Sequence, residues 1–130
     1  MLRLDFIFWA SGADRVIAPT TGATGAGSFL QMWYAIEGYD GADVVARRVA
    51  ARPAHLGRLT ALRDQGRLLL AGPCPAIDAE DPGPAGFSGS IVIAEFPSLA
   101  EARAWAEADP YIEAGVYQRV EVRPFRPVLP

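Results

Sequence analysis

The order of the predicted elements constrains this chain most, because two parts of the sequence each read as strand, helix and strand. Residues 32–37 and 68–71 are short runs of strand-forming residues that flank a helical region. Residues 90–96 and 117–123 flank a second helical region in the same way. This order is typical of a ferredoxin-like fold. We therefore expect an α+β domain with a four-stranded antiparallel sheet and both helices on one face.

The first helical region predicts two pieces. Residues 44–51 read as a short helix that Asp43 can cap. Pro53 lacks an N–H and fits best in the first turn of a helix, so a main helix is expected from about residue 53 to residue 65. Gly66 is the expected C-terminal cap of that helix.

The only histidine of the chain, His55, lies inside the best helical pattern. Leu56, Leu59 and Leu62 mark an apolar stripe, and at about 100° per residue the side chain of His55 projects into that stripe. An inward histidine has either a partner or a chemical task. A core histidine that a backbone carbonyl satisfies and a functional histidine are equal alternatives at this point.

The second helix brings a carboxylate toward the same place. Ser98 and Glu101 form a capping box that begins this helix, and Asp109 is its expected last residue before Pro110. In the predicted topology the start of the first helix and the end of the second share one edge of the domain. We therefore expect Asp109 close to His55, where a carboxylate would fix the tautomer of the imidazole. The alternative is that Asp109 only caps the following turn.

Composition argues against several classes of protein. The net charge of −3 disfavours a nucleic-acid-binding surface, and no apolar run approaches the ~20 residues that cross a bilayer. One cysteine, Cys74, and one histidine predict neither an intrachain disulfide nor a zinc site of the usual type. A reducing cytoplasm fits this cysteine content. No dinucleotide-binding fingerprint is present, and we expect no cofactor.

The chain divides into two unequal parts. Residues 19–28 are small, uncharged and glycine-rich, as in a flexible linker. We expect residues 1–31 to be a flexible N-terminal extension and residues 32–130 to form one domain. The segment from residue 75 to residue 89 is rich in proline, glycine, aspartate and alanine. A loop of this length inside a compact domain is often functional, and this one is a candidate lid.

The last strand predicts a sheet with two different faces. Val120 and Val122 project to one side, and Arg119, Glu121 and Arg123 project to the other. Helices on one face leave the second face open, and a homodimer that stacks sheet on sheet would bury it. The alternative is a polar face in contact with solvent.

Four motifs together resemble the YciI-like (YCII-related) family of the dimeric α/β-barrel superfamily, over about residues 32–128. They are Arg52-Pro53-Ala54-His55-Leu56, the run Leu-Leu-Leu-Ala-Gly-Pro at 68–73, Gly89-Ser90, and Ala108-Asp109-Pro110-Tyr111. The resemblance implies a ferredoxin-like subunit that dimerises through its sheets into an α/β barrel. It also implies an active site built on a His–Asp dyad, which maps onto His55 and Asp109.

Two functional hypotheses follow. In the first, a cofactor-free enzyme uses His55, oriented by Asp109, as general acid and base in an isomerisation or elimination on a small cyclic or aromatic compound. Arg52 would hold an anionic group, and Ser90 or Tyr111 would donate a hydrogen bond; a solvated arginine and a packing tyrosine are the alternatives. The resemblance implies lyase or isomerase chemistry like that of dehydrochlorinases or muconolactone isomerases. In the second hypothesis, the protein is a non-catalytic dimeric module that binds a small ligand or a partner.

Overall fold

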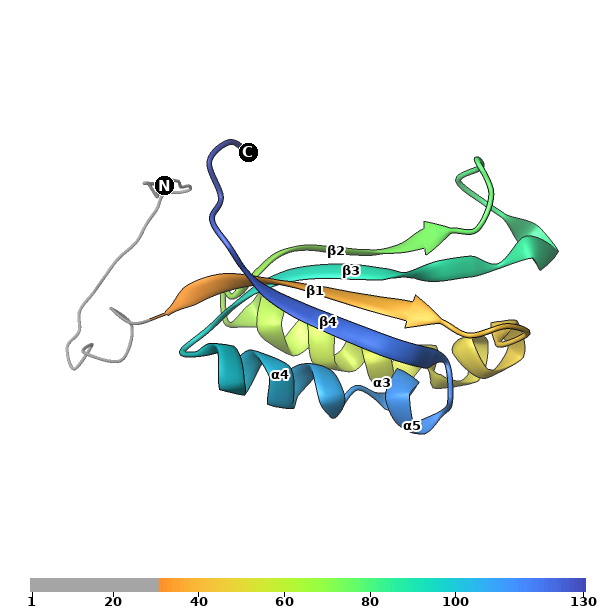
Figure 1. Ribbon diagram of the computed structural model, residues 1–130, viewed down its shortest axis with the longest axis horizontal. Coiled ribbons are helices and arrows are strands. Elements are labelled where there is room, and N and C mark those ends of the chain that lie inside the picture. The colour runs from red at the N-terminus through yellow and green to blue at the C-terminus, as the bar shows by residue number, and fades with distance from the viewer. Residues whose placement is uncertain (1–30) are drawn as a thin grey trace.

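The computed structural model describes residues 31–130, which form one sheet covered by helices on a single face (Figure 1). The elements are β1 (Met32–Asp40), α3 (Val45–Asp64), β2 (Leu68–Pro75), a short 3₁₀ helix η1 (Gly83–Ala85), β3 (Phe87–Phe96), α4 (Leu99–Glu107), α5 (Pro110–Glu113) and β4 (Tyr117–Phe125). All strand pairs are antiparallel, in the order β2-β3-β1-β4. The predicted α+β ferredoxin-like fold is confirmed. The predicted extension, residues 1–31, lies outside the described residues except for its last position.

The hydrophobic core lies between the sheet and the helices. Alternate residues of β1 and β3 point into it, while α3 and α4 each contribute one apolar side. Its buried members are Tyr34, Ile36, Leu59, Leu62, Val92, Ala94, Phe96, Ala102 and Ala106. The inward side of β4, predicted from its alternation, packs against this cluster through Val120 and Val122. The period-two and helical patterns of the sequence therefore converge on this cluster, and Val44, Tyr111 and Val116 form a second, smaller one.

The helix α3 is continuous over 20 residues, so the prediction of two helices separated at Pro53 is wrong. Pro53 lies inside α3, where its missing N–H leaves the carbonyl of Val49 without an intrahelical donor. Both residues are exposed, so this loss falls on the solvent side. The buried side chains of α3 continue across the proline as one stripe: Arg48, His55, Leu59 and Leu62. The contacts of this stripe hold the two halves in one helix.

The two ends of α3 differ from each other in how they are capped. Val44 is the N-cap and makes no side-chain capping hydrogen bond. Asp43 has a φ of 54° and does not cap the helix, which corrects the prediction. At the other end Gly66 has a φ of 72°, and its N–H donates to the carbonyl of Arg63 at 2.9 Å. The predicted C-terminal glycine is confirmed, because this left-handed position favours a residue without a Cβ.

The strands extend beyond their predicted ends. β2 continues to Pro75, although the predicted strand ended at residue 71, and β4 includes Pro124. Both strands lie at edges of the sheet, where a proline whose missing N–H faces outward costs no ladder hydrogen bond. The loop predicted at 75–89 therefore shortens to residues 76–86.

Two glycines allow a close approach between β1, β3 and β4. A Cβ on Gly89 would collide with the backbone carbonyl of Gly38. A Cβ on Gly38 would in turn fall at 2.6 Å from two ring carbons of Tyr117. The absence of side chains at both positions lets the Tyr117 ring lie against β1, next to the end of α3 that carries the candidate site.

Candidate active site

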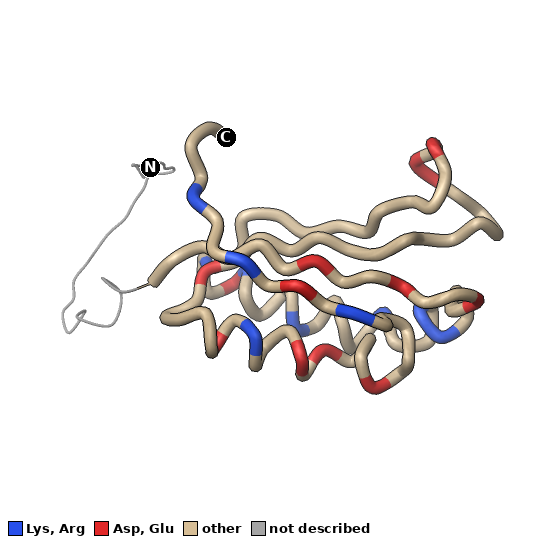
Figure 2. The backbone as a smooth tube through the Cα atoms, viewed as in Figure 1, with Lys and Arg blue, Asp and Glu red and all other residues tan. Residues whose placement is uncertain are grey.

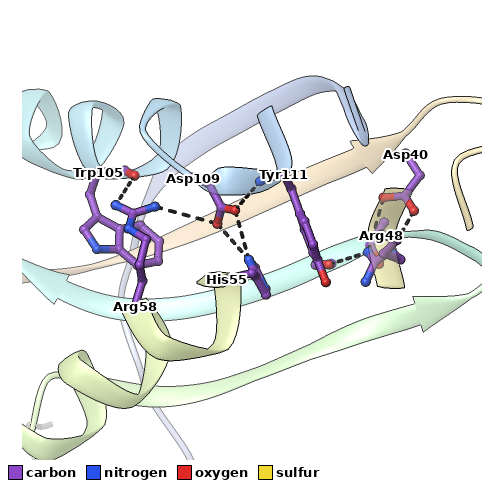
Figure 3. Close-up of polar contacts among 9 residues, drawn as sticks. Asp40, Arg48, His55, Arg58, Trp105, Asp109 and Tyr111 are labelled. Carbon is purple, nitrogen blue, oxygen red and sulfur yellow. Dashed lines mark hydrogen bonds and ion pairs between the residues drawn. The ribbon is translucent and has the colours of Figure 1, made fainter. Parts of the chain in front are cut away.

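His55 and Asp109 meet beneath the sheet, at the junction of α3 with α5 (Figure 3). The Nδ1 of His55 lies 2.9 Å from Oδ2 and 3.0 Å from Oδ1 of Asp109. Both residues are buried, at 6% and 4% exposure. An ionised carboxylate only accepts hydrogen bonds, so Nδ1 carries a hydrogen and Nε2 of the neutral ring keeps a lone pair. Nε2 makes no hydrogen bond to any residue of 31–130.

Asp109 owes its position to a helix cap. Ser98 caps α4 as predicted, with its Oγ accepting from the N–H of Glu101 at 3.1 Å. That helix ends at Glu107, so Asp109 is not its last residue as predicted. It is the N-cap of α5, and its Oδ1 accepts from the N–H of Tyr111 at 2.8 Å. The same carboxylate therefore both caps α5 and binds the imidazole. The two alternatives for Asp109, a partner of His55 and a cap of the following turn, hold together.

A third charged group contacts this carboxylate. The Nη1 of Arg58, one turn after His55 on α3, lies 3.8 Å from Oδ2 of Asp109. Its Nη2 donates to the carbonyl of Trp105 at 2.7 Å, and the guanidinium lies 4.3 Å from the centre of the indole ring. Burial lowers the pKa of Arg58, and the negative charge of Asp109 opposes this shift. Arg58 was not predicted from the sequence.

Tyr111 forms the centre of a stack of side chains. Its ring is 4.0 Å from the His55 ring at an interplanar angle of 11°, and the guanidinium of Arg48 lies 4.9 Å from its centre (Figure 3). Phe87 packs on Arg48 at 5.0 Å. The edge of Tyr111 meets the ring of Tyr117. Tyr111 is 1% exposed, and its buried ring separates the guanidinium of Arg48 from the imidazole of His55.

Arg48 organises the other half of the site. Its Nε binds Oδ2 of Asp40 at 2.8 Å, and their side chains are only 8% and 1% exposed. The Nη2 donates to Oδ1 of Asp40 at 3.2 Å, to the carbonyl of Gly89 at 3.1 Å and to Oγ of Ser90 at 2.7 Å. Tyr117 also hydrogen-bonds Ser90. This buried network ties α3 to β1, β3 and β4.

The structure brings four of the five predicted site residues together. His55 and Asp109 are in contact, Tyr111 stacks on His55, and the Ser90 hydroxyl lies in the Arg48 network. Arg52 is exposed and has no hydrogen bond or ion pair within residues 31–130. Its charge nevertheless acts on Tyr111, as one of the influences that lower the pKa of that phenol.

Arg48 was missed, although the sequence carries a signal for it. It precedes His55 by seven residues, which is two helical turns, and so continues the buried stripe of α3. The prediction of a helix break at Pro53 interrupted that stripe. A buried arginine on an inward stripe requires a carboxylate, and Asp40 at the end of β1 provides it.

The tyrosines of the site predict instability in alkali. Burial raises the pKa of Tyr117 well above 10.0, while its hydrogen bond to Ser90 opposes this; burial also raises the pKa of Tyr111. Above pH 10 the unfolded chain loses phenol protons that the folded chain keeps. The unfolded state then binds fewer protons, so stability falls as pH rises, by at most about 1.4 kcal/mol per pH unit for Tyr117.

Urea unfolding between pH 8 and 11 measures this effect. All 12 basic residues of the chain are arginines, so lysine titration does not obscure it. Tyr117→Phe should flatten the decline, and Tyr39→Phe, which removes a half-buried phenol, should leave it steeper than Tyr117→Phe does. An identical slope in wild type and Tyr117→Phe would contradict the assignment.

Three further features concern the described part of the chain. Within residues 31–130 no three side chains of histidine, cysteine, aspartate or glutamate gather in an arrangement that holds a metal ion. No helix in that part of the chain has the length and apolar character needed to cross a membrane. A shallow groove of about 290 Å³ runs between α3 and α4 and is lined by Arg58, Ala61, Leu62, Gln65, Arg67 and Trp105. It lies beside Arg58 and does not include His55.

Comparison with known proteins agrees with the predicted family. Residues 32–126 match the family model of the YCII-related domain. The chain is 60% identical to Protein YciI of Escherichia coli O6:H1 over 98 residues, which are 75% of this chain and 100% of that protein. It is 52% identical to an uncharacterized protein of Haemophilus influenzae over 98 residues, with the same shares covered.

A solved structure has the same fold at lower identity. It is 5-chloro-2-hydroxyhydroquinone dehydrochlorinase (TftG) from Burkholderia phenoliruptrix AC1100, in complex with 2,5-dihydroxybenzoquinone. The TM-score is 0.64 and the identity 24%, with 73% of this chain and 94% of that chain covered. The likeness to this structure supports the fold, and the family match covers most of the sequence. The chain therefore belongs to the YCII-related family.

Proposed function

We propose that the protein is a cofactor-free enzyme in which His55 moves a proton on a small cyclic or aromatic compound. The contact of Nδ1 with both oxygens of Asp109 carries this proposal, because it orients the ring and leaves Nε2 free to take or give a proton. Asp109 stabilises the imidazolium that forms when Nε2 takes a proton. An isomerisation returns that proton elsewhere on the compound, and an elimination expels a leaving group instead.

The surrounding residues support an anionic substrate. Arg52 is an exposed cation whose charge reaches Tyr111, so it is the proposed contact for an anionic group. His55 and Arg48 cover the two faces of the Tyr111 ring (Figure 3), so the proposed role of Tyr111 is to donate a hydrogen bond through its hydroxyl. Ser90 already binds Arg48 and Tyr117, so its proposed role is to hold these two side chains rather than to attack.

A compound screen tests the proposed function. Phenols, small lactones and chlorinated hydroquinones are the first choices, the last because a dehydrochlorinase shares the fold. Turnover followed by absorbance or released chloride, and lost in a His55 variant, is the expected result. Saturable binding of a compound without conversion would instead favour the ligand-binding module.

We also propose that the protein is a homodimer that stacks its sheets. The face of the sheet opposite the helices, called the outer face here, bears no element of the described chain (Figure 1). Val92 and Ala94 point into the core, so the outer face near β2 carries apolar side chains: Ala35, Leu70, Ile91 and Ile93. Leu70 is 53% exposed in the single chain. Burial of this apolar half against a second copy would stabilise the pair.

The other half of the outer face is polar. Charged positions of both signs follow one another along β4 (Figure 2). Arg123 binds Glu37 at 3.0 Å, Arg119 pairs with Glu121, and the guanidinium of Arg119 covers the ring of Tyr39. These pairs satisfy the charges within one sheet, so a second sheet could pack on them without meeting unpaired ions.

Light scattering after size-exclusion chromatography tests the dimer. The wild-type protein is expected to have twice the mass of one chain, and Ile93→Glu is expected to give monomers because it places a carboxylate in the stacked faces. Val49→Glu, a change of an exposed residue on α3, is the matched control and should stay dimeric. A monomeric wild type, or a dimeric Ile93→Glu variant, would refute this arrangement.

A further inference from the structure

Arg58 holds a position that a purely structural arginine does not explain. Its Nη1 is buried and donates no hydrogen bond within residues 31–130, although it lies 3.8 Å from Oδ2 of Asp109. The Nη2 donates to the Trp105 carbonyl, and the guanidinium lies over the Trp105 ring. A buried donor without a partner is costly unless its charge serves another group. Here that group is the carboxylate of Asp109.

We propose that Arg58 is a positioning residue that shares the Asp109 carboxylate with His55 and thereby keeps the imidazole available as a neutral base. The Nδ1 of His55 and the Nη1 of Arg58 contact the same oxygen, Oδ2. Arg58 is always charged, so it offsets the carboxylate before His55 takes a proton. The imidazolium then gains less from Asp109 than it would in an isolated pair.

The charged and titratable groups around His55 fall into two sets. Asp109 and Tyr111 face it from the start of α5, and Arg58, Arg52 and Arg48 lie on its own helix. Tyr117 of β4 and Asp40 of β1 stand behind Tyr111. Asp40 is already paired with Arg48, and both phenols are neutral below pH 10. Arg58 is therefore the cation that acts most directly through Asp109.

The single histidine makes this inference measurable without a substrate. His55 is the only histidine of the sequence, so protein labelled with ¹⁵N and ¹³C gives one set of imidazole NMR signals. The change of these signals with pH gives the titration midpoint. Arg58→Gln should raise that midpoint by about half a pH unit or more, because the imidazolium loses a neighbouring positive charge. Arg63→Gln, which removes an exposed charge from the same helix, should leave it within about 0.1 unit.

Two more variants separate charge from folding. Arg58→Lys keeps the charge and should shift the midpoint less than Arg58→Gln does. In an Asp109→Asn background, Arg58→Gln should raise the midpoint less than in the wild type, because only the direct repulsion between Arg58 and the imidazolium is then removed. An unchanged midpoint in folded Arg58→Gln, or an equal shift in the lysine variant, would overturn the positioning role.

This inference rests on the proposed function, but the two can fail separately. The NMR titration reports on Arg58 whether or not the protein turns over any compound. If a substrate is found, the pH profile of kcat in Arg58→Gln should move in the same direction as the NMR midpoint. A His55 variant with full activity would refute the proposed enzyme and leave the charge coupling of Arg58 intact.

Discussion

Replacing His55 with glutamine is expected to reduce kcat for any compound that the protein converts by about 10²- to 10⁴-fold, the usual contribution of general acid–base catalysis. Glutamine fills much of the imidazole volume beside Tyr111 and can donate to Asp109, but it cannot take up a proton near neutral pH. The KM should change much less than kcat. Initial rates across substrate concentration, with urea unfolding of the same sample, make the comparison.

Asp109 allows the same site to be tested without disturbing the helix. Asparagine can still accept the hydrogen bond from the N–H of Tyr111 and cap α5, but it has no charge to orient and stabilise the imidazolium. Asp109→Asn should therefore lose much of kcat at little cost in stability. Asp109→Ala should lose the same activity and about 1 kcal/mol of stability in addition.

A comparison of Asp109→Asn with Asp109→Ala could contradict this prediction. If Asp109→Asn kept wild-type rates while Asp109→Ala lost them, the carboxylate would matter only as a cap. His55 would then stand alone in the reaction.

Replacing Arg48 with methionine is expected to have the largest effect on stability, about 3–5 kcal/mol of the free energy of unfolding. The change leaves the Asp40 carboxylate, whose side chain is 1% exposed, buried without its cation. It also removes the donor to Ser90 and to the carbonyl of Gly89. Burial lowers the pKa of Arg48, but the hydrogen bonds and charge of Asp40 raise it more, so this arginine stays charged.

Two controls identify the cause of that loss. Arg47→Met, the neighbouring exposed arginine that binds the carbonyl of Gly115, should cost less than about 1 kcal/mol. The double variant Asp40→Leu with Arg48→Met should recover a large part of the loss, because it removes both buried charges together. Urea unfolding of the wild type, Arg48→Met, Arg47→Met and the double variant measures these differences in stability. A double variant no more stable than Arg48→Met would show that the hydrogen bonds to β3 dominate.

The order of elements could be predicted because the local signals are strong and agree. Alternation in the strand at 117–123, the Ser98 cap and the glycine at 66 each specify a local conformation that the tertiary fold also requires. Most of the errors involve proline, and the predicted Asp43 cap is an exception. The local preference of proline places it at helix starts and strand ends, but Pro53 and Pro73 lie on exposed or edge positions where the missing N–H costs little.

The contact between His55 and Asp109 could be predicted because it depends on topology, which brings one end of each helix to the same edge. The other partners could not. Arg48 was lost with the helix break at Pro53, and Arg58 contacts Asp109 only because α5 turns away from α4 after Glu107. Helical periodicity places a residue on a face, but it does not say which of two helices a carboxylate caps.

Asp109 both caps α5 and binds His55, and this combination limits how the protein can change over evolutionary time. The position that begins α5 and also holds the candidate base cannot drift freely, because the helix start favours the few residues that can cap it. Arg52 and the loop at 76–86 lie at the surface and have no such tie to the core. New substrates are therefore expected to arise through changes at those positions, around a candidate pair in which the requirement for a helix cap already restricts residue 109.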